Sequence, residues 1–189
     1  MGAPKLILAG AAAMAVLVTS CSSSGNDAAT KWAGDVCSAY SGLAKSVGMF
    51  KQSVKIDKNS SQSTLEQTKQ QVEQNLSAVK NSAQNLKTTV ADAPSDLNDD
   101  VKQAQAQLKT SGDRAKASID GVGQAASGLA NANGSGLATQ LGIVGVALAA
   151  ATSDVQSFLS QLKDYVSSSE SALKDAFGSA DSCKSVSKG

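Results

Sequence analysis

Apolar residues recur at alternating steps of three and four along most of this chain. Four such stripes are found, from Trp32 to Val54, from Leu65 to Val90, from Leu97 to Leu129 and from Leu137 to Phe177. This spacing places apolar side chains on one face of an α-helix. No segment alternates between apolar and polar residues as a half-buried strand does. The pattern therefore predicts four amphipathic helices.

Polar segments between the stripes predict where the helices begin and end. The Ser-rich stretch from Lys55 to Gln62 is a turn, and Ser63 with Glu66 has the capping-box spacing at the start of the second helix. Acidic residues between Asp96 and Asp100 favour the positive end of the third helix. The Asn- and Gly-rich segment 131–136 then separates the third helix from the fourth.

Four helices joined by short turns predict an all-α fold, an antiparallel four-helix bundle with heptad-type packing. At about 1.5 Å per residue, the first two helices would be roughly 45 Å long, the third about 55 Å and the fourth about 60 Å. We therefore expect the hairpin of the third and fourth helices to protrude beyond the other two, or the fourth helix to bend.

Composition narrows the class of protein further. The 189 residues are 41% hydrophobic and only 3% aromatic, which suits one modest domain with a core of Ala, Leu and Val. The formal net charge is +1, so no dense basic face is expected and no nucleic-acid partner is predicted. Histidine is absent, which removes the commonest general base and a common zinc ligand.

The N-terminus has the pattern of an export signal. Lys5 precedes an apolar run from Leu6 to Val18, which is too short to span a bilayer. The run ends in Val18-Thr19-Ser20-Cys21, which resembles the bacterial lipobox. The resemblance implies a signal peptide over residues 1–20 and a diacylglyceryl group on Cys21, whose two acyl chains would anchor the protein stably.

This assignment sets the expected domain organisation. Residues 21–29 would be the lipidated cysteine and a flexible tether, and residues 30–189 the helical-bundle domain. The protein would then be held by its lipid at the outer face of the bacterial cytoplasmic membrane. The alternative is an ordinary cleaved signal peptide with an incidental cysteine.

Two further cysteines, Cys37 and Cys183, lie near opposite ends of the mature sequence. In an exported chain, a disulfide between them is the economical interpretation. Two free thiols or a redox pair are the alternative, although no Cys-x-x-Cys spacing favours it.

The stretch from Gly121 to Ser153 contains no charged residue and covers the predicted tip of the third and fourth helices. One interpretation is a contact surface for a partner, with Leu137, Leu141 and Val144 as its apolar residues, because small neighbours allow helices to approach closely. The other is that its Gly and Ala residues pack inside the bundle. A membrane-spanning helix is disfavoured, because Gln140 and the Asn-Gly turn interrupt the apolar run.

No motif for catalysis or metal binding is complete. The segment Asp96 to Asp100 resembles the start of a calcium loop, but Val101 occupies the required Gly position and Gln107 the bidentate Glu position. Glycine-rich phosphate loops and nucleophile elbows are absent, and no serine has a histidine partner. We therefore predict no enzyme activity, no metal and no cofactor.

Three features resemble the small secreted or lipoprotein helical proteins of actinobacteria. They are Trp32 and Cys37 in the segment 31–37, the late Cys183, and the Ala-, Val- and Leu-rich stripes between them. The resemblance covers most of the mature chain. It implies the bridge from Cys37 to Cys183 and an exported address, and since most members of this group have no assigned activity, it implies little about function.

Two functions follow as hypotheses. The first is a lipid-anchored, non-catalytic envelope protein that acts as an interaction or structural module and contacts an envelope protein or lipid through its uncharged tip. The second is a carrier of an apolar small molecule or envelope lipid between the helices. Space for such a ligand would lie beside small core residues, namely Ala83, Ala104, Ala115 and Ala126.

Overall fold

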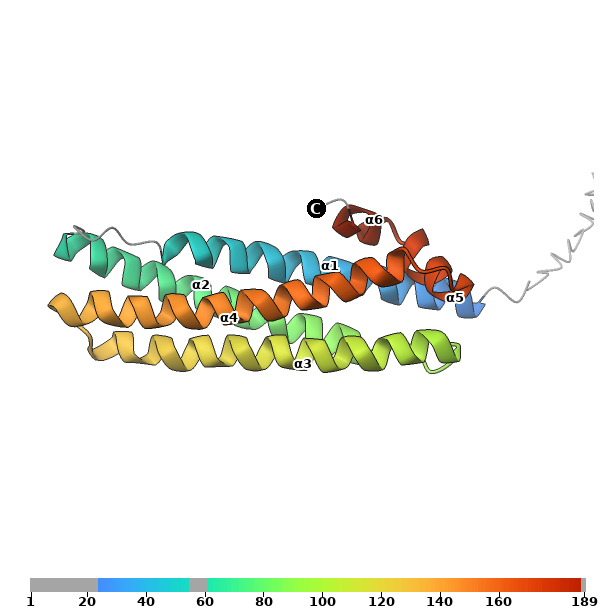
Figure 1. The fold of residues 1–189 in the computed structure, drawn as a ribbon, viewed down its shortest axis with the longest axis horizontal. Coiled ribbons are helices and arrows are strands. Elements are labelled where there is room, and N and C mark those ends of the chain that lie inside the picture. Colours follow the sequence, from blue (N-terminus) through green and yellow to red (C-terminus); the bar gives the residue numbers. More distant parts are fainter. Residues whose placement is uncertain (1–23, 55–60, 188–189) are drawn as a thin grey trace, which may run out of the picture.

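A computed structural model describes residues 24–54 and 61–187 of the chain. Four long helices account for most of them: α1 (Ser24–Ser53), α2 (Gln62–Ala91), α3 (Asp99–Ser127) and α4 (Gly134–Val166). Successive helices run antiparallel, and the described part of the chain contains no strand (Figure 1). The predicted all-helical class and the antiparallel packing of four long helices are confirmed.

The predicted helix lengths were wrong for the second half of the chain. The four helices contain 30, 30, 29 and 33 residues, which corresponds to about 45 to 50 Å each. The hairpin of α3 and α4 therefore does not protrude, and its tip lies beside the start of α2 (Figure 1). The third helix is shorter than expected because a 3₁₀ turn, η1 (Gly128–Asn131), replaces its last turn.

The fourth apolar stripe is interrupted after Val166. The run Ser167-Ser168-Ser169 ends α4, and the Ser167 hydroxyl donates to the Lys163 carbonyl oxygen. Three short elements follow: α5 (Ser171–Leu173), the π-helical turn η2 (Lys174–Gly178) and α6 (Asp181–Ser187). The expected single helix through Phe177 is thus a long helix and a separate C-terminal segment, residues 167–187.

This C-terminal segment folds back onto α1 and α4 (Figure 1). The Ser182 hydroxyl donates to the Gly34 carbonyl oxygen over 2.7 Å, and the Thr30 hydroxyl to that of Asp175 over 3.1 Å. Phe177 is fully buried, with its ring centroid 5.7 Å from that of Trp32 and 5.5 Å from that of Tyr165. Packing of Phe177 against Trp32 and Tyr165 therefore covers the core at the end of the bundle where α1 begins.

The helix starts show which capping predictions were right. Asn98 caps α3, its Oδ1 accepting the Val101 N–H at 2.9 Å, with Asp99 and Asp100 in the first turn as predicted. The cap of α2 is Ser61, which accepts the Thr64 N–H, so the N-cap lies two residues before the predicted Ser63, and the predicted pair of Ser63 and Glu66 does not cap the helix.

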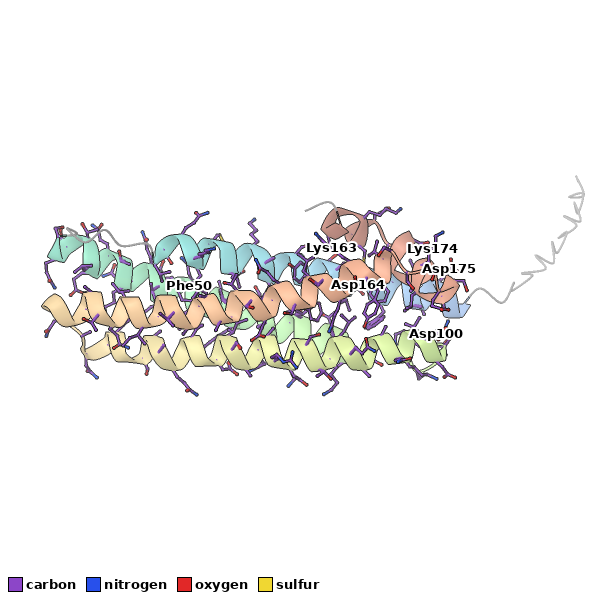
Figure 2. The ribbon with its side chains drawn as sticks, in the orientation of Figure 1. Phe50, Asp100, Lys163, Asp164, Lys174 and Asp175 are labelled. Carbon is purple, nitrogen blue, oxygen red and sulfur yellow. A yellow bond between two sulfur atoms is a disulfide. The ribbon has the colours of Figure 1, made fainter. Side chains whose placement is uncertain are left out.

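Side chains at the two ends of the bundle differ in character. Phe50, in the last turn of α1, is fully buried in the core, whereas Asp100, Lys174 and Asp175 gather at the opposite end (Figure 2). Charged side chains are also found at the α3–α4 hairpin tip, where Lys69 Nζ donates to the Ala130 carbonyl oxygen at 3.3 Å.

Candidate functional site

The two predicted half-cystines are joined in the structure. Cys37 on α1 and Cys183 on α6 form a disulfide with a Cα–Cα distance of 5.1 Å across a sequence separation of 146 residues. Both are fully buried. The predicted disulfide is confirmed, and it attaches the C-terminal segment covalently to the first helix.

The predicted lipidation site, Cys21, lies outside the described residues. Helix α1 begins at Ser24, and Ala29 is already buried in the core. Residues 24–29 were predicted to belong to a flexible tether, and in the structure they form the first turns of α1. The Asp-Ala-Ala sequence at residues 27–29 explains the difference, because it places an acid in the first helical turn and then strong helix formers.

The three residues predicted to contact a partner are in the core. Leu137, Leu141 and Val144 are 0%, 1% and 0% exposed. Their spacing of four and three places them on the inward face of α4. The prediction that these side chains form an exposed contact surface was therefore wrong for the folded chain.

The outward face of the same part of α4 is nevertheless apolar. Val146 is 75% exposed and Ile143 is 48% exposed, and Gly142, Ala149 and Ala150 beside them are also exposed. From Gly134 to Ser153 this helix carries no charged or aromatic residue. We call the outward residues between Ala138 and Ser153 the α4 face.

The hydropathy of α4 as a whole is also high. By length and composition, the segment Gly136–Val166 could cross a membrane, and 28% of its most apolar window is buried in the bundle. Mostly buried core helices of soluble proteins meet the same criterion of length and composition.

A series of polar contacts fixes α4 against α3. Tyr165 donates to Gln107 Oε1 at 2.6 Å, and Gln140 Nε2 donates to the Ala125 carbonyl oxygen at 2.7 Å. Between these, the Ser111 hydroxyl donates to Gln161, and Ser118 to Asp154. These contacts set the rotation of α4 about its axis and keep the α4 face turned to solvent.

Sequence reasoning missed these contacts because isolated Ser, Gln and Tyr residues at helix flanks look like ordinary surface positions. Burial raises the pKa of Tyr165, and the negative charge of Asp164 raises it further. The phenol therefore remains protonated at neutral pH, as its role as donor to Gln107 requires.

The acidic residues in the described part of the chain do not gather into a metal site. Within residues 24–54 and 61–187, no group of three or more Cys, Asp or Glu side chains is arranged to hold a metal ion. Asp96 precedes the Asn98 cap, and Asp99 and Asp100 lie in the first turn of α3, so this acidic segment forms a helix start.

The space proposed for a carried ligand is occupied by packing. Ala83, Ala104, Ala115 and Ala126 are all buried in the core. A groove of about 590 Å³ lies elsewhere, between α1 and α2. Carriage of an apolar molecule between the helices stays a prediction.

The fold and the bridge together define the class of this molecule: a disulfide-closed antiparallel helical bundle with one apolar, uncharged outward face. Comparison with known proteins adds no relative, since the chain matches no family model, no curated protein and no solved structure.

Proposed function

We propose that this chain is a lipid-anchored, non-catalytic protein of the bacterial cell envelope that acts as an interaction module. The α4 face would bind a helix of another envelope protein. The observation that carries this proposal is the exposure of Val146 and Ile143 on a helix surface without charge. Exposed apolar surface of this kind on a soluble domain is typical of interaction sites.

The composition of the α4 face favours a protein helix over a lipid surface. Helices that lie on membranes carry Lys or Arg on their polar side and Trp, Phe or Leu on the other. The α4 face instead presents Gly142, Ala149 and Ala150 around Val146. Small residues allow a partner helix to approach closely, while Val146 and Ile143 project into its surface.

The position of the anchor supports this arrangement. Only Ser22 and Ser23 separate Cys21 from the start of α1. The start of α4 lies at the opposite end of the bundle (Figure 1), about 45 Å away along α1. An anchor at Cys21 would therefore leave the α4 face far from the lipid and available to proteins.

The absence of histidine and of any complete catalytic motif supports a non-catalytic role. No cofactor or metal is part of the proposal. The resemblance to actinobacterial lipoproteins supports the exported address.

A site-specific photo-crosslinker at position 146 of the full-length chain, expressed in its native host, tests the proposal. We expect one discrete crosslinked protein from position 146. With the crosslinker at position 150, we expect the same crosslinked protein from the otherwise wild-type chain and none from the Val146→Lys variant. Met49→Lys is the matched control, since Met49 is 43% exposed on α1. Equal crosslinking in Val146→Lys and wild type, or none at all from the folded wild type, would overturn the proposal.

A further inference from the structure

A second surface feature, independent of the α4 face, lies on the other side of α1. The groove between α1 and α2 has a volume of about 590 Å³, within the usual range for small-molecule sites. Its walls mix small apolar residues with polar ones. The lining includes Lys31, Trp32, Asp35, Ala39, Gly42 and Asp92.

The groove exists because α1 lacks side-chain volume where it faces α2. Ala39 and Gly42 line it, and a Cβ added at Gly42 would meet no atom within 4 Å. Two contacts hold the helices in register. Trp32 Nε1 donates to the Thr89 carbonyl oxygen at 3.0 Å, and the Ser46 and Ser82 hydroxyls are 3.0 Å apart. The hollow is therefore part of the folded state and needs no rearrangement to form.

The charged residues that line the groove are Lys31, Asp35 and Asp92, which together carry one net negative charge. Lys31 pairs with Asp35, their Nζ and Oδ2 atoms being 2.7 Å apart. Asp92, the remaining charged residue of the lining, has no cationic partner within 4.0 Å in the part of the chain that the structure describes. It is also the C-cap of α2, where the helix dipole adds negative potential and favours a cation.

We propose that this groove binds an organic cation with a short apolar tail. The cationic head would lie beside the Asp92 carboxylate. The antiparallel register places Ala39 and Gly42 further along the groove from Asp92, so the tail would run toward them and past Trp32. The carboxylate of Asp92 would select the cationic head of the ligand. The space beside Ala39 and Gly42 would accommodate its apolar tail.

Trp32 makes this proposal directly measurable, because it is the one tryptophan of the chain and it lines the groove. The probe is hexyltrimethylammonium, titrated into the full-length protein while Trp fluorescence is followed. Hexan-1-ol, which has the same tail and no charge, is the matched ligand control. We expect a saturable fluorescence change with the cation only.

Three variants locate the binding. Asp92→Asn should weaken it about two- to fivefold, the ratio that an exposed ion pair supplies, and Gly42→Leu should abolish it by filling the groove. Gly121→Leu is the matched control, because a Cβ at that glycine also meets nothing within 4 Å and the position lies on α3. Far-UV circular dichroism checks that each variant is folded.

The outcomes are decisive in both directions. Saturable binding that Gly42→Leu abolishes, Asp92→Asn weakens and Gly121→Leu preserves supports the site. No saturable signal from folded wild type, equal response to hexanol, or unchanged binding in Asp92→Asn or Gly42→Leu would overturn it. Crosslinking from position 146 does not depend on this groove, so the two proposals fail separately.

Discussion

At the scale of single residues, Asp113 links α2 to α3 through one carboxylate. Lys87 Nζ on α2 lies 2.9 Å from its Oδ1, and Lys109 Nζ on α3 lies 3.0 Å from its Oδ2. The ion pair with Lys87 and then the hydrogen bond from Lys109 hold the pKa of Asp113 below its usual value, and they outweigh the desolvation that raises it. The folded chain thus releases this proton more readily than the unfolded chain.

The lowered pKa of Asp113 makes stability depend on pH in a known direction. The contribution is fully present above the unfolded Asp pKa of about 3.9 and is lost as the pH falls through the lower folded-state pKa. We expect Asp113→Asn to remove this part of the acid dependence, and to cost less than about 1 kcal/mol near neutral pH because the side chain is partly exposed. Urea unfolding across the acid range measures both effects.

A matched control for Asp113 lies on α1. The pair of Lys31 and Asp35 lies within one helix and is more exposed, so Asp35→Asn removes a paired carboxylate without breaking a link between two helices. An Asp113→Asn profile that superimposes on that of wild type would contradict the assignment.

Gly128 lies directly against the side-chain amide of Gln140. A Cβ at Gly128 would collide with the Gln140 side-chain amide, which donates to the Ala125 carbonyl oxygen. We expect Gly128→Ala to displace that amide and destabilise the fold by about 1 kcal/mol, the net value of one such hydrogen bond. The measurement is the urea midpoint at constant m-value.

The double variant Gly128→Ala with Gln140→Ala separates a clash with the Gln140 amide from an effect of the added methyl group on the backbone. In a Gln140→Ala background the added methyl group meets no amide, so Gly128→Ala should be neutral or slightly stabilising. If Gly128→Ala destabilises the wild-type chain and the Gln140→Ala variant by the same amount, the two substitutions are additive. That result would contradict the proposed contact.

At the scale of elements, the apolar stripes were sufficient to locate the four long helices, because burial decides helix position more strongly than local propensity. Boundaries were harder to predict. Ser61 and Ser63 are chemically equivalent caps, and only the geometry of the first turn selects Ser61. The stripe from Val166 to Leu173 keeps a seven-residue spacing across the break, so periodicity alone did not show that Ser167 ends α4.

The candidate surfaces illustrate what a linear pattern leaves undetermined. Gly121 to Ser153 is visibly uncharged in the sequence, and its spacing marks Leu137, Leu141 and Val144 as the inward face of α4. The sequence does not show that Ile143 and Val146, on the other side of α4, stay uncovered by another element of the fold. The α1–α2 groove depends on absent volume at Gly42. A position without a side chain forms part of a groove only when a second helix lies beside it. The groove could therefore be predicted only if the pairing of α1 with α2 were already known.

At the scale of the whole molecule, the disulfide between Cys37 and Cys183 encloses nearly the entire domain, with a separation of 146 residues. Closing a loop of this length lowers the entropy of the unfolded chain and stabilises the fold by about 5 kcal/mol in the chain-entropy model. Small domains have total stabilities of about 5 to 15 kcal/mol. The bridge is therefore expected to be a large share of the stability of this bundle.

Replacing both half-cystines by alanine tests how that stabilisation arises. If the bridge acts mainly on the unfolded chain, the variant should lose up to about 5 kcal/mol while its urea m-value rises, because the open chain exposes more surface on unfolding. Amide exchange in α3 should then accelerate along with exchange in α6, since both report global unfolding. Faster exchange confined to the C-terminal segment, with α3 protected as in wild type, would contradict this view and show that the bridge acts locally by holding α6 against α1.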